Sequence, residues 1–286
     1  MDALSKKHIV NAKKQMSWVL LLSAFTLIVS VVAIGLGSSQ NLDFFTTLKI
    51  LFGIESAGEL ESAIIWELRF PRILMAIVGG ATLAIAGSLM QGSLGNPLVS
   101  PLTLGVASGA ALGAALAIIL DFSIVSNSNL AIVFNAFLFS LIVVAIIIQL
   151  GNYRSVSAES YILVGIAITF IAGAIVSTMQ YFATDAQLSQ LAHWSFGSLS
   201  RPTLVNTLWV SVALVGLLPF AFQKAWDLNT LALGGDDFAI STGVDPIKTR
   251  KHILILSAFM TSTVIAFTGL IGFVGLAAPH MGRLIV

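Results

Sequence analysis

The stretch Leu228–Lys251, LNTLALGGDDFAISTGVDPIKTRK, is the longest polar segment of the chain apart from a short basic N-terminus. It contains two adjacent carboxylates, Asp236 and Asp237, and closes on a basic run that ends at Lys251. Apolar runs of membrane-spanning length flank it, so we expect it to lie in water at one end of a bundle of transmembrane helices. Such a segment is where a partner outside the membrane can act on the helices inside it.

The composition is that of an all-α integral membrane protein. Hydrophobic residues make up 57% of the chain and charged residues 9%, and the mean hydropathy is +0.98. Soluble domains have about 25% charged residues. The absence of cysteine excludes disulfides and thiolate chemistry, and the net charge of +1 gives no indication of a nucleic-acid partner.

Apolar runs of about 17 residues or more predict the transmembrane helices. They are Trp18–Leu36, Ile73–Met90, Leu104–Leu120, Leu130–Leu150, Tyr161–Met179 and Leu204–Phe222. The longer tract Ile253–Ala278 is interrupted by glycines, so it predicts a span, a Gly-rich turn and a short return helix. The expected total is about eight spans, with residues 1–16 as an N-terminal segment and 17–286 as one transmembrane domain.

The distribution of Lys and Arg predicts the orientation in the membrane. With the N-terminus inside, ten of these residues fall in cytoplasmic segments and four in outer segments. We therefore expect a cytoplasmic N-terminus and a cytoplasmic loop at 224–251.

Small residues recur every four positions in several predicted helices. Such spacing lets helix backbones approach closely. The series are Gly80, Ala84, Ser88 and Gly92; Gly105, Gly109 and Gly113; and Gly165, Thr169, Gly173 and Ser177.

The sequence shows no energy source of its own. No carboxylate or histidine falls near the middle of a predicted span, whereas ion-coupled carriers place ionisable groups inside the membrane. A phosphate-binding G-x-x-x-x-G-K-[ST] loop is also absent, and no set of catalytic or metal-ligating residues is evident. These observations predict a partner that supplies energy through the loop at 224–251.

Four motifs follow one another along the chain. They are RFPR at 69–72, QGSLGNPLVSPLTLG at 91–105, LALGGDDFAISTGV at 231–244 and TGLIGFVGLAAPHMGRL at 268–284. In this order and spacing the chain resembles the FecCD family of ABC importer permeases, which transport ferric siderophores, haem and cobalamin. The resemblance extends from about Arg69 to the last residue.

The resemblance implies a type II ABC importer transmembrane fold of ten spans in a prokaryotic cell (inner) membrane. It implies a second permease subunit, two ATP-binding cassette ATPase subunits that bind ATP and Mg, and an extracytoplasmic substrate-binding protein. It implies no cofactor in this chain and no enzymatic activity of its own.

The resemblance also assigns roles to residues. Arg69 is expected to contact the binding protein, and a helix near Leu188–Gly197 to cap the translocation path. The expected ATPase-coupling residues are Leu231, Gly234, Asp236, Asp237, Ala239, Gly243 and Val244. The expected cytoplasmic gate consists of Asn96, Pro97 and Leu98 in one turn and Ser157, Ala158 and Glu159 in another.

The sequence departs from the family pattern at two places. Gly235-Asp236-Asp237 stands where members often have one acidic residue. The chain also ends at Val286, where the family continues with two more spans, so we expect that roughly one helix pair is missing.

The leading hypothesis is a ferric-siderophore permease, with haem or cobalamin as alternative cargo. An ion-coupled secondary transporter and a receptor-like membrane subunit are the alternatives from other classes. Uptake that needs no ATPase would indicate the first of these, and absence of flux with all partners present would indicate the second.

Overall fold

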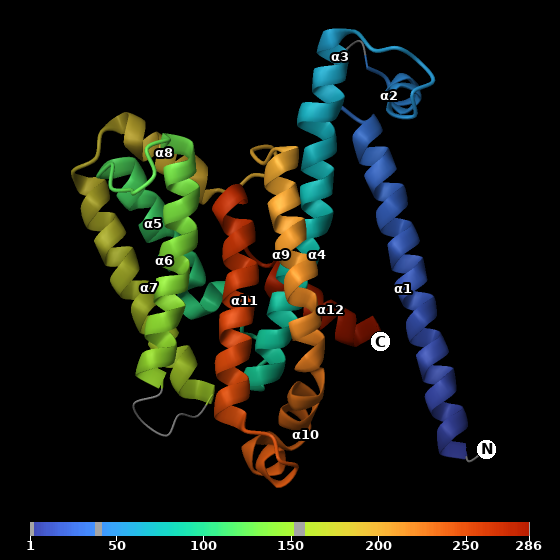
Figure 1. Ribbon diagram of the computed structural model, residues 1–286, viewed down its shortest axis with the longest axis vertical. Coiled ribbons are helices and arrows are strands. Elements are labelled where there is room, and N and C mark those ends of the chain that lie inside the picture. The colour runs from blue at the N-terminus through green and yellow to red at the C-terminus, as the bar shows by residue number, and fades with distance from the viewer. Residues whose placement is uncertain (1–2, 38–41, 152–157, 286) are drawn as a thin grey trace. The chain divides into compact units, whose positions relative to one another are not determined.

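A computed structural model describes residues 3–37, 42–151 and 158–285, and every regular element in these ranges is a helix (Figure 1). The predicted all-α class is therefore confirmed. The predicted gate residue Ser157 lies outside the described residues.

The elements are α1 (Ala3–Gly35), α2 (Phe44–Leu51), α3 (Glu59–Ala63), η1 (Ile64–Arg69), α4 (Phe70–Leu94), η2 (Leu102–Val106), α5 (Ala107–Ile119), α6 (Ser128–Gly151), α7 (Ala158–Tyr181), α8 (Asp185–Ser195), α9 (Leu204–Gln223), α10 (Ala225–Ser241), α11 (Pro246–Thr268) and α12 (Val274–Ile285).

Seven helical stretches in the described ranges are long and apolar enough to cross a membrane. They are Ala12–Gly35, Glu59–Leu94, Leu102–Ile119, Ser128–Leu150, Ala158–Tyr181, Leu204–Gln223 and Pro246–Thr268. This agrees roughly with the predicted count of about eight. The difference is α12, the predicted return helix, which at 12 residues is too short to span.

The second span begins earlier than the sequence predicted. Its helix runs from Glu59 through the π-helical turn η1 into α4, so the RFPR motif lies inside a helix and not at its start. In η1 the amide of Phe70 bonds to the carbonyl of Ile65, one residue further back than in an α-helix. This wider turn precedes Pro71, which has no N–H to donate and would otherwise break the helix.

The chain forms two compact units, Met1–Leu74 with His280–Val286, and Met75–Pro279. In the first unit the guanidinium of Arg69 connects α1 and α2. Its Nη1 donates to the carbonyl of Ile34 at 3.1 Å and to Oγ1 of Thr47 at 3.2 Å.

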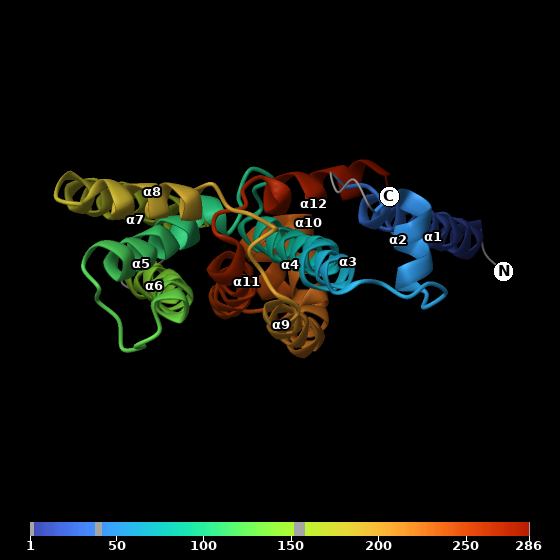
Figure 2. The same ribbon diagram turned by 90° about the horizontal axis from the view of Figure 1, so that it is seen from above.

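The second unit is built around α11, which lies between α6 and α9 (Figures 1 and 2). Of its membrane-spanning window, 72% is buried. Buried Ser140 of α6 donates to Ser262 of α11 at 2.6 Å, which joins the two helices inside the core. Within a membrane, apolar side chains gain little by leaving lipid for another helix, so hydrogen bonds of this kind help to hold the helices together.

The glycine series of α5 allows a close approach to α6. A Cβ at Gly109 would collide with the carbonyl oxygen of Phe139, and one at Gly113 with that of Asn135. The predicted close packing is therefore present on this helix. It is absent at Gly80 and Gly173, where a Cβ would meet no atom within 4 Å.

The Gly-rich turn after α11 also forms as predicted. Gly269 ends α11 with φ 75° and ψ −167°, a conformation that only glycine adopts easily. The carbonyl of Thr268 accepts a bond from Ser198 at 2.7 Å. The chain then turns back into the bundle, where the amide of Gln91 donates to the carbonyl of Leu276 at 3.2 Å and Gly275 lies against Gly87.

We expect Gly87→Ala to destabilise the second unit by about 1–3 kcal/mol, because the added Cβ would overlap the carbonyl of Gly275. Gly80→Ala on the same helix is the matched control, because its Cβ would enter open space. Thermal unfolding of the purified variants in detergent measures the difference. Equal melting temperatures would show that the Gly87–Gly275 contact has no role.

Candidate functional site

The predicted loop at 224–251 is an ordered, mostly helical element at the end of the second unit opposite α8 (Figure 1). Helix α10 is divided at Gly235, whose φ of 69° and ψ of −160° require glycine. Two helical segments result, one before Gly235 and one after it. A turn at Gly243 then leads to Asp245, which caps the N-terminus of α11.

Arg250 anchors the second segment of α10 to the bundle. Its Nη1 donates to Oδ2 of Asp236 at 2.8 Å, and its Nη2 bonds to Oδ1 of the same carboxylate. Its Nε donates to the carbonyl of Ser93, at the end of α4, at 3.0 Å. The Arg250 side chain is only 7% exposed, and a buried guanidinium requires such partners.

Through Arg250, the second segment of α10 is therefore connected with the end of α4, which leads into the first predicted gate turn.

The first segment of α10 is held by a separate set of contacts. Lys224 pairs with Asp227 at 2.8 Å, and Oγ1 of Thr249 donates to the same carboxylate at 3.4 Å. Leu228 packs against Gly92 of α4, and Leu231 is buried. Both halves of α10 are thus attached to α4 and α11.

The outer face of this element is apolar and exposed. Leu233 is 80% exposed and Ile240 62%, and Phe238 and Ile247 are also exposed. Exposed apolar side chains that are held on an ordered element are typical of a docking surface for another protein.

The neighbouring carboxylates Asp236 and Asp237, both predicted to be ATPase-coupling residues, have different surroundings. Asp236 faces inward to Arg250, whereas Asp237 is exposed. Ala239 is fully buried, and its carbonyl accepts the amide of Val244 at 2.9 Å. The side chain of Phe238 occupies the space where a Cβ of Gly234 would lie. The predicted coupling residues are therefore brought together, some on the inner and some on the outer face.

The turn that ends this element depends on two residues. Gly243 has φ 84°, and its amide donates to Ile240 at 3.0 Å. The carboxylate of Asp245 accepts the amide of Lys248 at 3.0 Å, and this bond lowers the pKa of Asp245 below its ordinary value. A charged cap here favours the start of α11.

The first predicted gate turn follows α4 at the same end of the unit. Oδ1 of Asn96 accepts the amide of Leu98 at 2.9 Å, which folds the turn around Pro97, and Leu98 is 74% exposed. In the second predicted turn Ala158 is buried and Glu159 lies in the first turn of α7. The structure places these described residues at helix ends.

The predicted docking residue Arg69 is engaged inside the first unit by Ile34 and Thr47. Its neighbour Arg72 in the same motif is exposed. Of the two arginines in this motif, Arg72 is therefore the one whose guanidinium is more accessible to another protein.

Sequence reasoning missed Arg250, which it treated as one member of a basic run. The signal in the sequence was the acidic pair at 236–237, which lies close enough to this basic run to suggest an ion pair between them. Among the described residues no three His, Asp or Glu side chains cluster as metal ligands. The arrangement is suited to transmitting force, because a partner that binds α10 would move α4 and α11 with it.

We expect Asp236→Asn to destabilise the protein by about 2 kcal/mol, because it leaves the charge of buried Arg250 uncompensated. Asp237→Asn is the control and should leave stability unchanged, because that side chain is exposed. Denaturation followed by intrinsic fluorescence measures both.

The double variant Asp236→Asn with Arg250→Met should recover much of the lost stability, since it removes both charges. If Asp236→Asn and Asp237→Asn behave alike, the proposed anchor is wrong.

Comparison with known proteins gives one consistent result. The FecCD transport family matches residues 23–286. A protein of Methanocaldococcus jannaschii named as an ABC transporter permease is 33% identical over 99% of this chain and 82% of its own length. The hemin transport system permease protein HmuU of Yersinia pestis is 34% identical over 90% of this chain and 77% of its own. A solved structure of a metal-chelate type ABC transporter in an inward-facing conformation matches with a TM-score of 0.79 and 28% identity, over 94% of this chain and 81% of the other.

Proposed function

The chain belongs to the FecCD transport family, and from that membership we propose that it carries a ferric siderophore across the cell membrane. It is the membrane-spanning permease subunit of an ABC importer for an iron chelate, haem or vitamin B12. The subunit is not itself an enzyme, because the ATPase of such importers is a separate subunit. Family membership leaves ion-coupled secondary transport without support.

The observation that carries the coupling proposal is the attachment of α10. Its outer face exposes Leu233 and Ile240, and its inner face is fixed to the bundle through Arg250. In the proposed mechanism an ATPase subunit docks on the outer face and closes on ATP and Mg. The movement then passes as a rigid-body shift to α4 and α11.

The remaining partners follow from the family and are proposals. A second permease subunit completes the translocation path, and an extracytoplasmic binding protein delivers the substrate. The proposed orientation has the N-terminus and α10 in the cytoplasm of a prokaryote, because ten Lys and Arg then lie inside and four outside.

The gate and docking assignments also remain proposals. Arg250 bonds to Ser93 near the end of α4, and the turn at Asn96–Leu98 follows shortly after it. In the proposed mechanism a movement of α10 therefore shifts this turn first. Ser157, Ala158 and Glu159 complete the proposed gate. For the binding protein we propose a contact at the RFPR motif, with Arg69 shaping the unit and exposed Arg72 reaching the partner.

The choice of a ferric siderophore over haem or cobalamin rests on the range of substrates in the family. A strain that lacks this protein should fail to grow on a ferric siderophore as sole iron source and should recover with the restored chain. Recovery on haem alone would instead identify a haem permease.

We expect Gly243→Val to abolish ATP-coupled uptake while the protein still inserts and assembles. A β-branched residue is strongly disfavoured at φ 84°, so the turn that positions α10 cannot form. Gly216→Val is the matched control, because a Cβ at either glycine enters open space and only Gly243 has positive φ. Uptake and ATPase activity are measured in proteoliposomes with all partners present.

Deletion of Asp236–Phe238 should have the same effect as Gly243→Val. Normal uptake by either variant would refute the coupling role of this element.

A further inference from the structure

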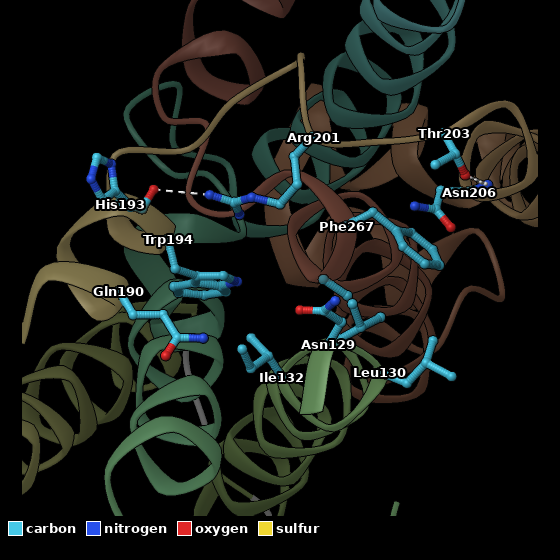
Figure 3. Close-up of a pocket in the computed structure, with 12 residues that line it drawn as sticks. Asn129, Leu130, Ile132, Gln190, His193, Trp194, Arg201, Thr203, Asn206 and Phe267 are labelled. Atoms are coloured by element: carbon cyan, nitrogen blue, oxygen red, sulfur yellow. Dashed lines mark hydrogen bonds between the residues drawn. The ribbon is translucent and has the colours of Figure 1, made fainter. Parts of the chain in front are cut away.

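A pocket of about 460 Å³ with several polar side chains in its lining lies at the α8 end of the second unit, far from α10 (Figures 1 and 3). It is bordered by the first turns of α6 and α9, the last turns of α8 and α11, and the segment between α8 and α9. Its polar lining consists of Asn129, Gln190, His193, Trp194, Arg201, Thr203 and Asn206. Among the described residues that line it, none is Asp or Glu.

Trp194 presents an unsatisfied donor to this pocket. The side chain is 4% exposed, and its Nε1 has no hydrogen-bond partner among the described residues. Figure 3 shows the indole nitrogen pointing into the space bordered by Asn129 and Arg201. Buried donors are nearly always paired in folded proteins, so this N–H indicates a ligand with an acceptor atom.

Arg201 adds a positive charge at the same place. Its Nη2 donates to the carbonyl of His193 at 2.9 Å, and none of the ion pairs found among the described residues includes it. Arg201 is exposed, so water reaches part of the guanidinium, and the protein around the rest lowers its pKa below the ordinary value. An anion in the pocket would compensate this charge.

The helix ends reinforce the preference for an anion. Thr203 caps α9, and Asn127 accepts the amides of Asn129 and Leu130 in the first turn of α6. The N-termini of both helices therefore border the pocket, and the N-terminal end of a helix dipole favours negative charge.

An apolar groove of about 660 Å³ continues from the pocket along α6, α9 and α11. The two spaces share the lining residues Leu130, Val133, Asn206, Ala266 and Phe267. Further along, the groove is lined by Phe137, Trp209, Val212 and Phe259. Each of these helices spans the membrane, so a long apolar groove on their surface fits a hydrocarbon chain.

We propose that this pocket and groove together bind one phospholipid, with its phosphate on Arg201 and the Trp194 indole N–H and one acyl chain along the groove. The amides of Asn129 and Asn206 are placed to bond the glycerol and headgroup oxygens. The acidic side chain of a partner protein would satisfy Arg201 but would leave the groove unexplained. The proposal requires a membrane protein but does not depend on the cargo or on the coupling role of α10.

The glycine break after α11 shapes this site. A Cβ at Gly269 would collide with the carbonyl of Trp194 and would lie 3.2 Å from Nη1 of Arg201. The TGLIG sequence thus lets α8 and the arginine close over the end of α11, which brings the indole and the guanidinium to one pocket.

The test is native mass spectrometry of the purified full-length protein, delipidated and then titrated with dioleoyl-phosphatidylglycerol. We expect one tightly retained lipid per chain. Arg201→Gln and Trp194→Phe should each weaken retention about tenfold, as expected for the loss of a charged or otherwise unpaired hydrogen bond. Ala213→Phe, which fills the groove, should weaken it comparably.

Lys251→Gln is the control, since it removes an exposed positive charge near the start of α11, at the opposite end of that helix from the pocket, and should leave retention unchanged. Thermal melting of each variant checks that it remains folded. Equal loss with Lys251→Gln and Arg201→Gln would overturn the proposal, because it would indicate nonspecific attraction.

Two other results would also overturn it. Binding of glycerol 3-phosphate as tightly as the lipid, with Ala213→Phe silent, would indicate a site for a soluble phosphate. Normal lipid retention by Arg201→Gln, together with lost capture of the binding protein, would indicate a protein-docking site.

Discussion

The buried guanidinium of Arg250 is the interaction on which the proposed mechanism depends. It is bonded to Asp236 of α10 and to the Ser93 carbonyl of α4, while its own backbone belongs to α11. Because the Asp236 side chain is partly exposed, we expect its loss to cost about 2 kcal/mol, and the pairing holds these three elements in one arrangement. A surface element that must move helices needs such an attachment, because a loosely connected loop would absorb the movement of a partner.

Glycine breaks explain how an apolar helical chain builds local sites. Gly105, Gly235 and Gly269 each take a positive φ where a helix would otherwise continue or end differently. Non-helical backbone is tolerated at membrane depth only where protein covers it. The breaks at Gly105 and Gly269 meet this condition, since Gly105 lies against α6 and α7 and Gly269 against the end of α8.

Much of the fold could be predicted from local sequence. The apolar runs, the turn after α11 and the short return helix all agree with the structure, because length, hydropathy and glycine content act locally. The start of the second span was wrong, because Pro71 was read as a boundary although the π-turn before it accommodates the proline. The hydrogen bonds of the Arg69 guanidinium to Ile34 and Thr47 could not be predicted, because these residues are distant from it in the sequence.

The sequence by itself determined that this is a multi-span α-helical membrane protein, and its four ordered motifs indicated the family. Only the tertiary structure decided that Asp236 pairs with buried Arg250 whereas Asp237 is an exposed charge. It alone brought Trp194 and Arg201 to one pocket beside an apolar groove. The physical reason is separation along the chain. Arg250 and Ser93 are 157 residues apart, and no local property of either predicts their contact.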